Sequence, residues 1–466
     1  MSLPLRPRPD TRTLPLTILT KTGLATWLKG AAAAPRNWVE GSGFKAEPGE
    51  ICLVPGEDGR PARALVGMPT EDGGEALWTA AGFTTRLPQG SYRLDPEPAD
   101  KAATRFALGW ALGAYAFARY KKPGRPAAEL VWPAGADREA VERMAGAIFF
   151  ARDLINTPAE DMGPAELAEA ARAMARELGM KATVIEGDAL TAKNYPLIHM
   201  VGRASARAPR LIDLRWGRSS DPRVTLVGKG VCFDTGGLDL KPESAMKNMK
   251  KDMGGAAHAL ALAQMIVRAE LPVRLRVLVP AVENAVSGNA MRPLDVVRSR
   301  KGLTVEIGNT DAEGRLILAD ALADASDEKP DLIVDFATLT GAARVALGPE
   351  LPALFCNDDG LAADLTRHAE AEADPMWRLP LWQPYRRRLD SRIADLNNIS
   401  DGPFAGAVTA ALFMQEFVGK DIPWAHFDLF AWNPYGRPGR PEGGEAQVIR
   451  AVYALIAERF GRTRRR

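Results

Sequence analysis

The sequence predicts an α/β protein with two domains, and three observations support this. A chain of 466 residues is longer than one hydrophobic core usually serves. Its composition, 46% hydrophobic and 25% charged, is that of an ordinary globular protein. Apolar strand-like runs alternate with helical periodicity, as in βαβ units around a buried sheet. We expect a small N-terminal α/β domain (residues 1–134) and a larger C-terminal α/β/α domain (residues 135–466) with a mixed, mainly parallel sheet.

The first third of the chain alternates short strands with turns. Strands are predicted where apolar runs are bounded by Pro, Gly or charged residues, and one helix is predicted at 101–120. A long amphipathic helix at about 137–155 ends before Asn156-Thr157-Pro158, and we interpret it as the linker between the domains. The predicted strands cover residues 14–19, 51–55, 62–68 and 129–132.

Strands and helices alternate regularly beyond residue 160. The motif-bearing loops follow directly after strands, and ligands of such sheets bind beyond the carboxyl ends of the strands. We therefore expect the functional site at that edge. The predicted helices cover residues 164–178, 255–269 and 314–324, and the predicted strands cover 182–185, 211–216, 224–227, 273–279, 304–307 and 332–336.

Several classes of function are excluded by what the sequence lacks. None of its four histidines lies in a His-Glu-x-x-His pattern, and there is no Gly-x-Ser-x-Gly elbow. Gly228-Lys229-Gly230 resembles only half of a P-loop. A net charge of +2 gives no reason to expect a nucleic-acid partner, although residues 462–466 are basic.

The expected compartment is the cytoplasm. The three cysteines are widely spaced, as in a reducing environment, and Cys232 is interpreted as a small buried hydrophobe. The first nine residues carry no apolar export signal. The longest apolar run, 106–118, is shorter than the roughly 20 residues that cross a bilayer, so we expect no membrane association.

Four carboxylates lie at strand ends or helix starts among glycines: Asp234, Asp252, Asp311 and Glu313. Taken singly, Asp252 and Asp311 could be helix caps. Four convergent carboxylates cannot all stay ionised in a buried site without compensation. Two divalent cations would supply it, and oxygen ligands with a nitrogen suit Mn²⁺, Mg²⁺ or Zn²⁺. Such a pair can hold a carbonyl and a bridging hydroxide.

The motifs around these acids resemble those of the leucyl aminopeptidase family of di-metal exopeptidases. The similarity extends from about residue 151 to the C-terminus, and its most specific element is an octapeptide at 309–316. The segments that carry it are Val227-Gly228-Lys229-Gly230, Asp234-Thr235-Gly236-Gly237, Lys250-Lys251-Asp252-Met253, Asn309-Thr310-Asp311-Ala312-Glu313-Gly314-Arg315-Leu316, residues 337–342, 389–398 and 424–428.

The resemblance implies five metal ligands in the catalytic domain. Asp234 and Glu313 would bridge two metals, Mn²⁺ or Zn²⁺, with Mg²⁺ or Co²⁺ as alternatives at one site. Lys229 and Asp252 would complete one site, and Asp311 would complete the other. A ligating lysine must be neutral, and two adjacent cations together with desolvation lower its pKa.

The resemblance also implies two cationic catalytic residues that do not ligate metal. Lys241 would stay charged and stabilise the developing oxyanion. Arg315 would hold a bicarbonate ion that accepts the proton of the bridging water. The alternative for Arg315 is an ion pair with Glu313 or another nearby acid.

Substrate contacts follow from the same resemblance. The pocket for the first side chain favours leucine or another apolar residue, although ordinary core packing remains an alternative for Met249. Residues 442–447 depart from the family pattern, and we expect part of the side-chain specificity to lie there. The implied contacts are Met249, Asn309, Ala312, Thr338 and Gly341 around the pocket, and Leu339 through its backbone.

The implied activity is the removal of N-terminal residues from short peptides by a homohexamer, because hexamers are usual in the family. Two alternatives remain open from the sequence. One is a dipeptidase acting on cysteinylglycine or similar thiol peptides. The other is a DNA-binding regulator on the same scaffold, which the near-neutral charge does not favour.

Overall fold

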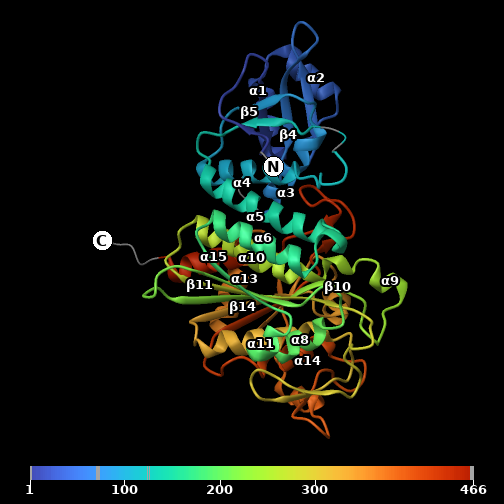
Figure 1. The fold of residues 1–466 in the computed structure, drawn as a ribbon. Helices are drawn as coiled ribbons and strands as arrows, with labels where there is room; N and C mark the ends of the chain where they lie inside the picture. The colour runs from blue at the N-terminus through green and yellow to red at the C-terminus, as the bar shows by residue number, and fades with distance from the viewer. Residues whose placement is uncertain (1–2, 70–73, 123, 125, 462–466) are drawn as a thin grey trace. The chain divides into compact units, whose positions relative to one another are not determined.

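The computed structural model describes residues 3–69, 74–122, 124 and 126–461 (Figure 1). The chain divides into two compact units, Met1–Phe149 with Tyr435–Glu442, and Phe150–Pro434 with Gly443–Arg466. Each unit contains its own sheet, so the predicted fold class of two α/β domains is confirmed. The basic tail at 462–466 lies outside the described residues. Within the described ranges, no helix is long and apolar enough to span a membrane.

The first unit is built on a six-stranded sheet with the order β1-β6-β5-β2-β4-β3. All neighbours pair in parallel except β3 and β4, which form an antiparallel hairpin. Its strands are β1 (Leu5–Arg6), β2 (Leu14–Leu19), β3 (Ile51–Pro55), β4 (Pro61–Gly67), β5 (Ser91–Leu94) and β6 (Glu129–Val131), and its helices are α1 (Lys21–Gly30), α2 (Ala33–Gly41), α3 (Gly74–Arg86) and α4 (Asp100–Gly113).

The predicted helix at 101–120 is too long, because α4 ends at Gly113. Glycine is a poor helix former, and a side chain at Gly113 would lie only 2.0 Å from the carbonyl oxygen of Ala81 in α3. The close packing of α3 and α4 therefore selects glycine at the helix end. Helices α1, α2 and α3 were not predicted, and each contains glycine, a poor helix former.

The second unit is built on a nine-stranded, mainly parallel sheet with the order β16-β15-β18-β14-β9-β11-β8-β7, in which β10 also pairs with β11. Only β7, β8 and β15 introduce antiparallel pairings. Its strands are β7 (Lys181–Glu186), β8 (Arg210–Trp216), β9 (Arg223–Gly228), β10 (Gly230–Asp234), β11 (Arg274–Asn284), β14 (Leu332–Ala337), β15 (Ala353–Cys356), β16 (Trp377–Arg378) and β18 (Trp424–Asp428).

Helices cover both faces of this sheet (Figure 1). Helices α6 (Pro164–Glu177), α10 (Gly254–Arg268), α13 (Asp359–Ala371) and α15 (Ile449–Phe460) lie on one face, and α8 (Pro196–Gly202), α11 (Glu313–Asp327) and α14 (Gly406–Gln415) lie on the other. The remaining elements are α5 (Arg138–Asn156), α7 (Ala189–Ala192), α9 (Glu243–Met246), α12 (Gly341–Leu347), β12 (Val296–Arg298), β13 (Thr304–Glu306), β17 (Leu396–Asn397), β19 (Trp432–Asn433), β20 (Gly443–Gly444), and the 3₁₀ turns η1 (Ala159–Asp161), η2 (Met249–Met253) and η3 (Gln383–Leu389).

The carboxyl ends of the parallel strands meet at one edge of the sheet. Lys229 directly follows β9, Thr338 follows β14, and Asp234 is the last residue of β10. Sequence patterning predicted β9 and β14 but not β10, whose five residues lie inside the glycine-rich motif. Polar residues far apart in the chain are thereby brought to the same edge, as expected of a parallel sheet.

A glycine allows α10 to start directly against the sheet. A side chain at Gly255 would lie 2.1 Å from the carbonyl oxygen of Phe336 in β14, so no larger residue fits without displacing the helix. Helix α10 is buried on all sides from Gly254 to Val267. Its position fixes η2, the turn immediately before it, and η2 carries Asp252.

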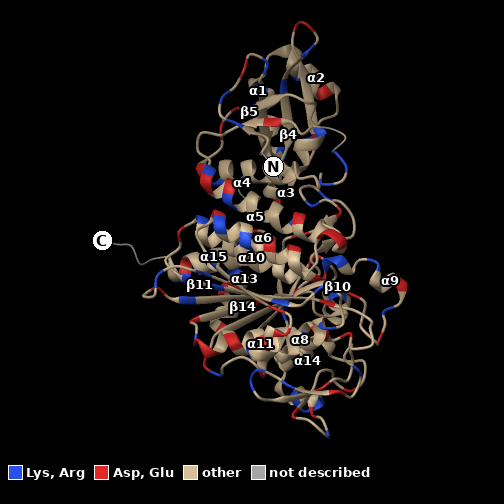
Figure 2. Ribbon diagram, in the orientation of Figure 1, with Lys and Arg blue, Asp and Glu red and all other residues tan. Residues whose placement is uncertain are grey.

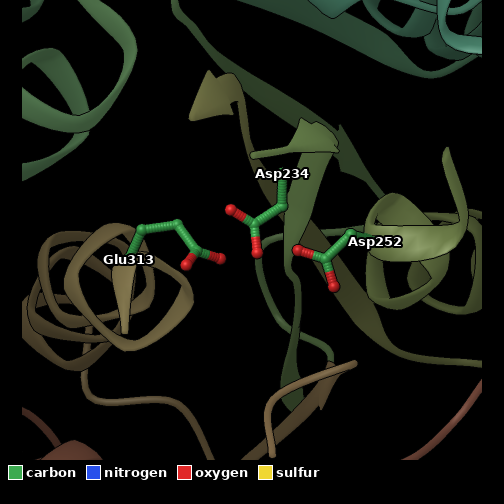
Figure 3. A group of neighbouring side chains, drawn as sticks. All are labelled: Asp234, Asp252 and Glu313. Atoms are coloured by element: carbon green, nitrogen blue, oxygen red, sulfur yellow. The ribbon is translucent and has the colours of Figure 1, made fainter. Parts of the chain in front are cut away.

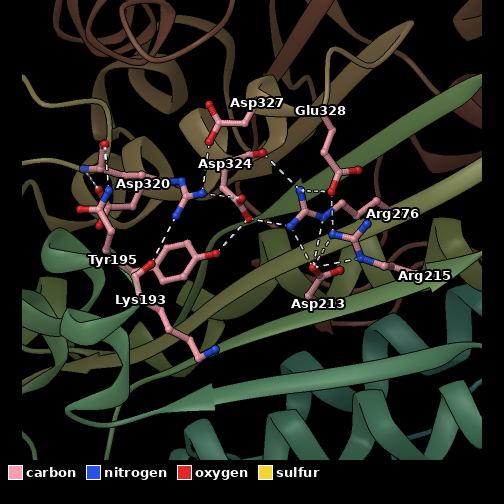
Figure 4. A network of polar contacts seen from close by, with 11 residues as sticks. Lys193, Tyr195, Asp213, Arg215, Arg276, Asp320, Asp324, Asp327 and Glu328 are labelled. Atoms are coloured by element: carbon pink, nitrogen blue, oxygen red, sulfur yellow. Dashed lines mark hydrogen bonds and ion pairs between the residues drawn. The ribbon is translucent and has the colours of Figure 1, made fainter.

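A network of charged side chains lies near the amino end of β11, with the buried Arg276 at its centre (Figure 4). Its Nη2 lies 2.8 Å from Asp213 Oδ2 and 2.6 Å from Asp324 Oδ2. Arg215 also contacts Asp213, at 3.0 Å, and Glu328, at 2.7 Å. The network joins β8 and β11 to the end of α11.

We predict that Arg276→Met lowers the free energy of unfolding of this unit by about 1.5–3 kcal/mol, because buried Asp324 and partly buried Asp213 lose a shared charged partner and keep only Arg300 and Arg215. Urea unfolding measures this change. Arg218→Met is the matched control, since Arg218 is exposed and forms no ion pair with any described residue; it should change stability by about 0.5 kcal/mol or less. Equal effects of the two substitutions would contradict a stabilising network.

Candidate metal centre

Three carboxylates converge at the carboxyl edge of the sheet: Asp234 at the end of β10, Asp252 in η2 and Glu313 at the start of α11 (Figure 3). Each offers one oxygen, and these oxygens lie within 4.8 Å of one another. All three residues are almost fully buried. Like charges at this separation repel strongly out of water, so the group requires cations.

Two lysines lie among the carboxylates. Lys229 Nζ lies 2.7 Å from Asp252 Oδ2 and 3.0 Å from Glu313 Oε1, and it donates a hydrogen bond to the carbonyl oxygen of Thr338. Lys241 Nζ lies 2.9 Å from Asp234 Oδ2. Together with Asp311, which contacts Lys241, these residues place all five proposed metal ligands and Lys241 in one cluster.

Asp311 belongs to the outer side of the cluster. Its carboxylate is one-third exposed, and its Oδ1 lies 2.5 Å from Lys241 Nζ. The alternative of helix capping does not hold for Asp311 or Asp252, because α10 and α11 begin without a side-chain cap.

Burial and the close spacing of the charged groups shift the pKa values of several residues in the cluster. Burial and the charge of Asp234 raise the pKa of Glu313 to about 8 and that of Asp311 to about 6. Burial opposes the charged form of Lys229, yet Asp252 and Glu313 overcome it and raise its pKa above the usual value. Without metal, Lys229 is thus held protonated, which is opposite to the neutral form that ligation requires.

The donor set fits divalent cations. Glu313 Oε2 is buried and receives no hydrogen bond from any described residue. Carboxylate oxygens are preferred ligands of Mg²⁺ and Mn²⁺ and are also used by Zn²⁺. The four carboxylates of the cluster, when ionised, carry more negative charge than a single divalent cation neutralises, and the amine of Lys229 offers a further neutral ligand.

Arg315 lies on the first turn of α11 and faces the cavity beside the cluster. Its Nη1 donates to the carbonyl oxygen of Asn398 at 2.7 Å, and its Nε has no hydrogen-bond partner among the described residues. Burial lowers the pKa of its guanidinium to about 10. The alternative of an ion pair with Glu313 is not formed, since no carboxylate of the described chain lies within 4.0 Å of Arg315. A buried, partly unpartnered guanidinium suits a small anion.

A cavity of about 560 Å³ opens onto the cluster. All six residues predicted to contact substrate line it: Met249, Asn309, Ala312, Thr338, Leu339 and Gly341. Met249 thus faces the cavity, contrary to the alternative of ordinary core packing. Of the proposed metal ligands and catalytic residues, Glu313 alone is not among the residues that line the cavity, and its side chain is buried.

The atypical segment at 442–447, where part of the side-chain specificity is expected, lies outside the residues that line this cavity. Glu445 is buried, and its Oε1 accepts hydrogen bonds from Nε and Nη2 of Arg152 at 3.0 and 2.9 Å. The Gln447 amide accepts from Ala431 N and donates to Pro349 O, both at 3.0 Å. Pro349 lines the cavity, so the segment supports a wall from behind.

Two supporting residues had no assigned role at the level of sequence. Asp428, at the end of β18, accepts hydrogen bonds from the backbone of Leu339 and Thr340 at 3.1 Å and so fixes the loop after β14. The Asn398 side chain accepts from Gly308 N at 2.8 Å and donates to Asn309 O at 2.8 Å. Asp428 and Asn398 both lie in segments that carry the family resemblance. Those segments are the sequence feature from which a role for the two residues could have been predicted.

A buried group of acids and lysines beside a cavity, at the carboxyl edge of an α/β sheet, is the arrangement expected of a metal-dependent hydrolase. Comparison with known proteins specifies the family. The family model described as cytosol aminopeptidase family, catalytic domain, matches residues 149–453, and the M17 aminopeptidase N-terminal domain matches residues 14–133. The chain belongs to the cytosol aminopeptidase family, and it is a metal-dependent aminopeptidase that acts on peptides.

Similar proteins cover nearly the whole chain. A "probable cytosol aminopeptidase" of Leifsonia xyli is 40% identical over 448 residues, which are 90% of each chain. The crystal structure of a cytosol aminopeptidase from Coxiella burnetii has a TM-score of 0.94 at 49% identity and covers 98% of this chain and 99% of its own. The bottromycin maturation enzyme BotP, solved in complex with Mn, has a TM-score of 0.85 at 35% identity, with 96% and 99% covered.

We predict that the affinity for Mn²⁺ rises with pH. The pKa values of Glu313 and Lys229 are both raised in the metal-free protein, so protons compete with the metal below those values. Calorimetric titration of metal-free protein at about pH 6 and about pH 8.5, in two buffers of different ionisation enthalpy, measures affinity and released protons. Glu313→Gln should release fewer protons. Equal affinity at both pH values, without proton release, would contradict the prediction.

Proposed function

We propose that this aminopeptidase removes leucine or another apolar residue from the N-terminus of short peptides at a two-metal centre. The observation that carries the proposal is the cavity, whose floor is the carboxylate cluster and whose wall includes all six proposed substrate contacts. A cavity of about 560 Å³ suits the end of a short peptide better than a folded chain.

The five proposed ligands have separate tasks. Asp234 and Glu313 would bridge the two metals, Lys229 and Asp252 would complete one site, and Asp311 would complete the other. Binding must remove the proton that the metal-free cluster keeps on Lys229. When bound, the metals lower the pKa of a coordinated water and polarise the scissile carbonyl. The presence of Mn in the related BotP structure supports Mn²⁺ as the first metal to test, with Zn²⁺, Mg²⁺ and Co²⁺ as alternatives.

Lys241 would stabilise the negative charge that develops on the carbonyl oxygen. Burial opposes its charged form, but Asp234 and Asp311 raise its pKa, so it remains an ammonium at neutral pH. Its Nζ lies within 2.9 Å of two acids of the cluster, which would put its charge close to the carbonyl of a peptide bound at the metals.

Arg315 would hold a bicarbonate ion near the same carbonyl. Its free Nε and its position on the cavity wall support this role. Bicarbonate would supply an oxygen that accepts a proton from the attacking water. The hydrogen bond to Asn398 would keep the guanidinium in place for that anion.

The proposals for assembly and location rest on the similarity to the family. We expect a homohexamer, as is usual for relatives, and a cytoplasmic location, in keeping with the names of the similar proteins. Lys and Arg alternate with Asp and Glu along the ribbon of both units (Figure 2), which does not favour a nucleic-acid partner.

Lys241→Met is predicted to lower kcat for leucyl-p-nitroanilide, measured with added Mn²⁺, by about 100-fold or more, because an oxyanion-stabilising charge is lost. Its Mn²⁺ content should remain that of the unaltered enzyme. Asp311→Ala should lose both activity and part of the bound metal. Full activity of Asp311→Ala after metal removal would contradict the two-metal proposal.

Light scattering tests the assembly. A mass near six times the 50.3 kDa of one chain is expected. A mass equal to that of a single chain at micromolar concentration would contradict the hexamer.

A further inference from the structure

Another cavity, of about 240 Å³, opens at the edge of the nine-stranded sheet that lies opposite the metal centre. The metal centre lies beyond the carboxyl ends of β9 and β14, whereas this cavity lies at the amino ends of β9 and β11. Its wall carries five positively charged side chains and a single negatively charged one, that of Glu328. The five cations are Lys181, Arg215, Arg223, Arg274 and Arg276.

The register of the sheet places the five cations side by side on one face. Arg276 of β11 pairs with Arg215 of β8, which in turn pairs with Lys181 of β7. Two positions earlier in β11, Arg274 pairs with Arg223 of β9. Paired residues, and residues two apart in one strand, point to the same side of a sheet. Like charges directly opposite each other destabilise a sheet, so three such pairs at one edge require a counter-charge.

The protein supplies a carboxylate counter-charge to only two of these cations. Arg215 contacts Asp213 and Glu328 at 3.0 and 2.7 Å, and Arg276 contacts the same two acids at 2.8 and 3.2 Å (Figure 4). The other three cations have no carboxylate oxygen within 4.0 Å of the side-chain nitrogens among the described residues: Lys181, Arg223 and Arg274.

The two unpaired arginines retain free donors. Arg223 is exposed, and its Nη1 donates to the carbonyl oxygen of Glu328 at 2.7 Å, while the nearby Asp331 carboxylate accepts from the backbone N of Arg223. Arg274 is half-buried, and its guanidinium donates to no described residue. A half-buried guanidinium without an acceptor is costly, so an anion bound here would be stabilised by charge-assisted hydrogen bonds.

We infer that this cavity binds a phosphate group. A phosphate group carries nearly two negative charges at neutral pH and presents three oxygens, which suits a wall with three unpaired cations. Guanidinium groups bind phosphate through pairs of parallel hydrogen bonds. The volume is below the roughly 300–1,000 Å³ of sites for larger ligands, so the cavity accommodates the phosphate itself. The group is either free phosphate or the end of a phosphorylated small molecule.

Equilibrium dialysis of the metal-bound enzyme against labelled inorganic phosphate, at about 0.15 M NaCl, tests the site. We expect one phosphate per chain with a Kd of about 1 mM or below, because several charge-assisted hydrogen bonds contribute. Arg274→Met should weaken this binding by about tenfold or more. Arg274→Lys should weaken it less, because the charge remains while the two-pronged geometry is lost.

Arg12→Met is the matched control. Arg12 is exposed, lies in the first unit and forms no ion pair with any described residue, so its replacement should leave phosphate binding unchanged. Phosphate that binds beside Arg315 persists in Arg274→Met, so the difference between that variant and the unaltered protein reports this cavity alone.

Thermal unfolding distinguishes a binding role of Arg274 from a structural one. Without phosphate, the unfolding midpoint of Arg274→Met should be equal to that of the unaltered protein or higher, because one pair of like charges is removed. Added phosphate should raise the midpoint of the unaltered protein more than that of the variant. A variant that unfolds at a lower temperature and gains as much from phosphate as the unaltered protein would overturn the inference.

AMP distinguishes the two sources of the phosphate group. AMP binding that Arg274→Met weakens assigns the site to a phosphorylated small molecule, and phosphate binding without AMP binding assigns it to the free ion. Equal phosphate binding by Arg274→Met and the unaltered protein overturns the inference. A DNA duplex that binds through Arg274, where neither phosphate nor AMP binds, also overturns it. The proposed aminopeptidase function stands or falls separately, because it depends on the opposite edge of the sheet.

Discussion

Repulsion among buried carboxylates is the constraint on which the catalytic unit depends. Asp234, Asp252 and Glu313 bring oxygens within 4.8 Å of one another where little water enters, and such a group persists only beside cations. Lys229 and Lys241 partly compensate, and a proton retained near Glu313 lowers the remaining charge. Metal binding replaces these protons with divalent cations. The repulsion among the carboxylates in the metal-free protein therefore favours metal binding.

The fold resists this repulsion by anchoring each charge on a different rigid element. The carboxylates come from the end of a strand, a turn before α10 and the first residue of α11, and each element is buried in the core. Gly255 lets α10 approach β14 without a side chain between them, and Asp252 is set by that approach. The cavity wall is held in the same way, by Asp428 on the neighbouring strand β18.

Sequence patterning predicts the buried strands well, because β9 and β14 are uninterrupted apolar runs. Patterning does not predict the short strand Gly230–Asp234, because its residues belong to a glycine-containing motif and the strand pairs only with β11, which is distant in the sequence. The proposed ligands could be named from the motifs, and the structure brings them together. The contact of Asn398 with Arg315 spans 83 positions, and such pairings have no local signal.

The central claim is that the carboxylate cluster is a two-metal site. Anomalous diffraction from a crystal of the unaltered protein grown with Mn²⁺ tests it most directly. The account predicts two manganese peaks, both within bonding distance of Asp234 and Glu313, with Lys229 and Asp252 next to one and Asp311 next to the other. Manganese bound elsewhere, with no peak between Asp234 and Glu313 at saturating Mn²⁺, would contradict it.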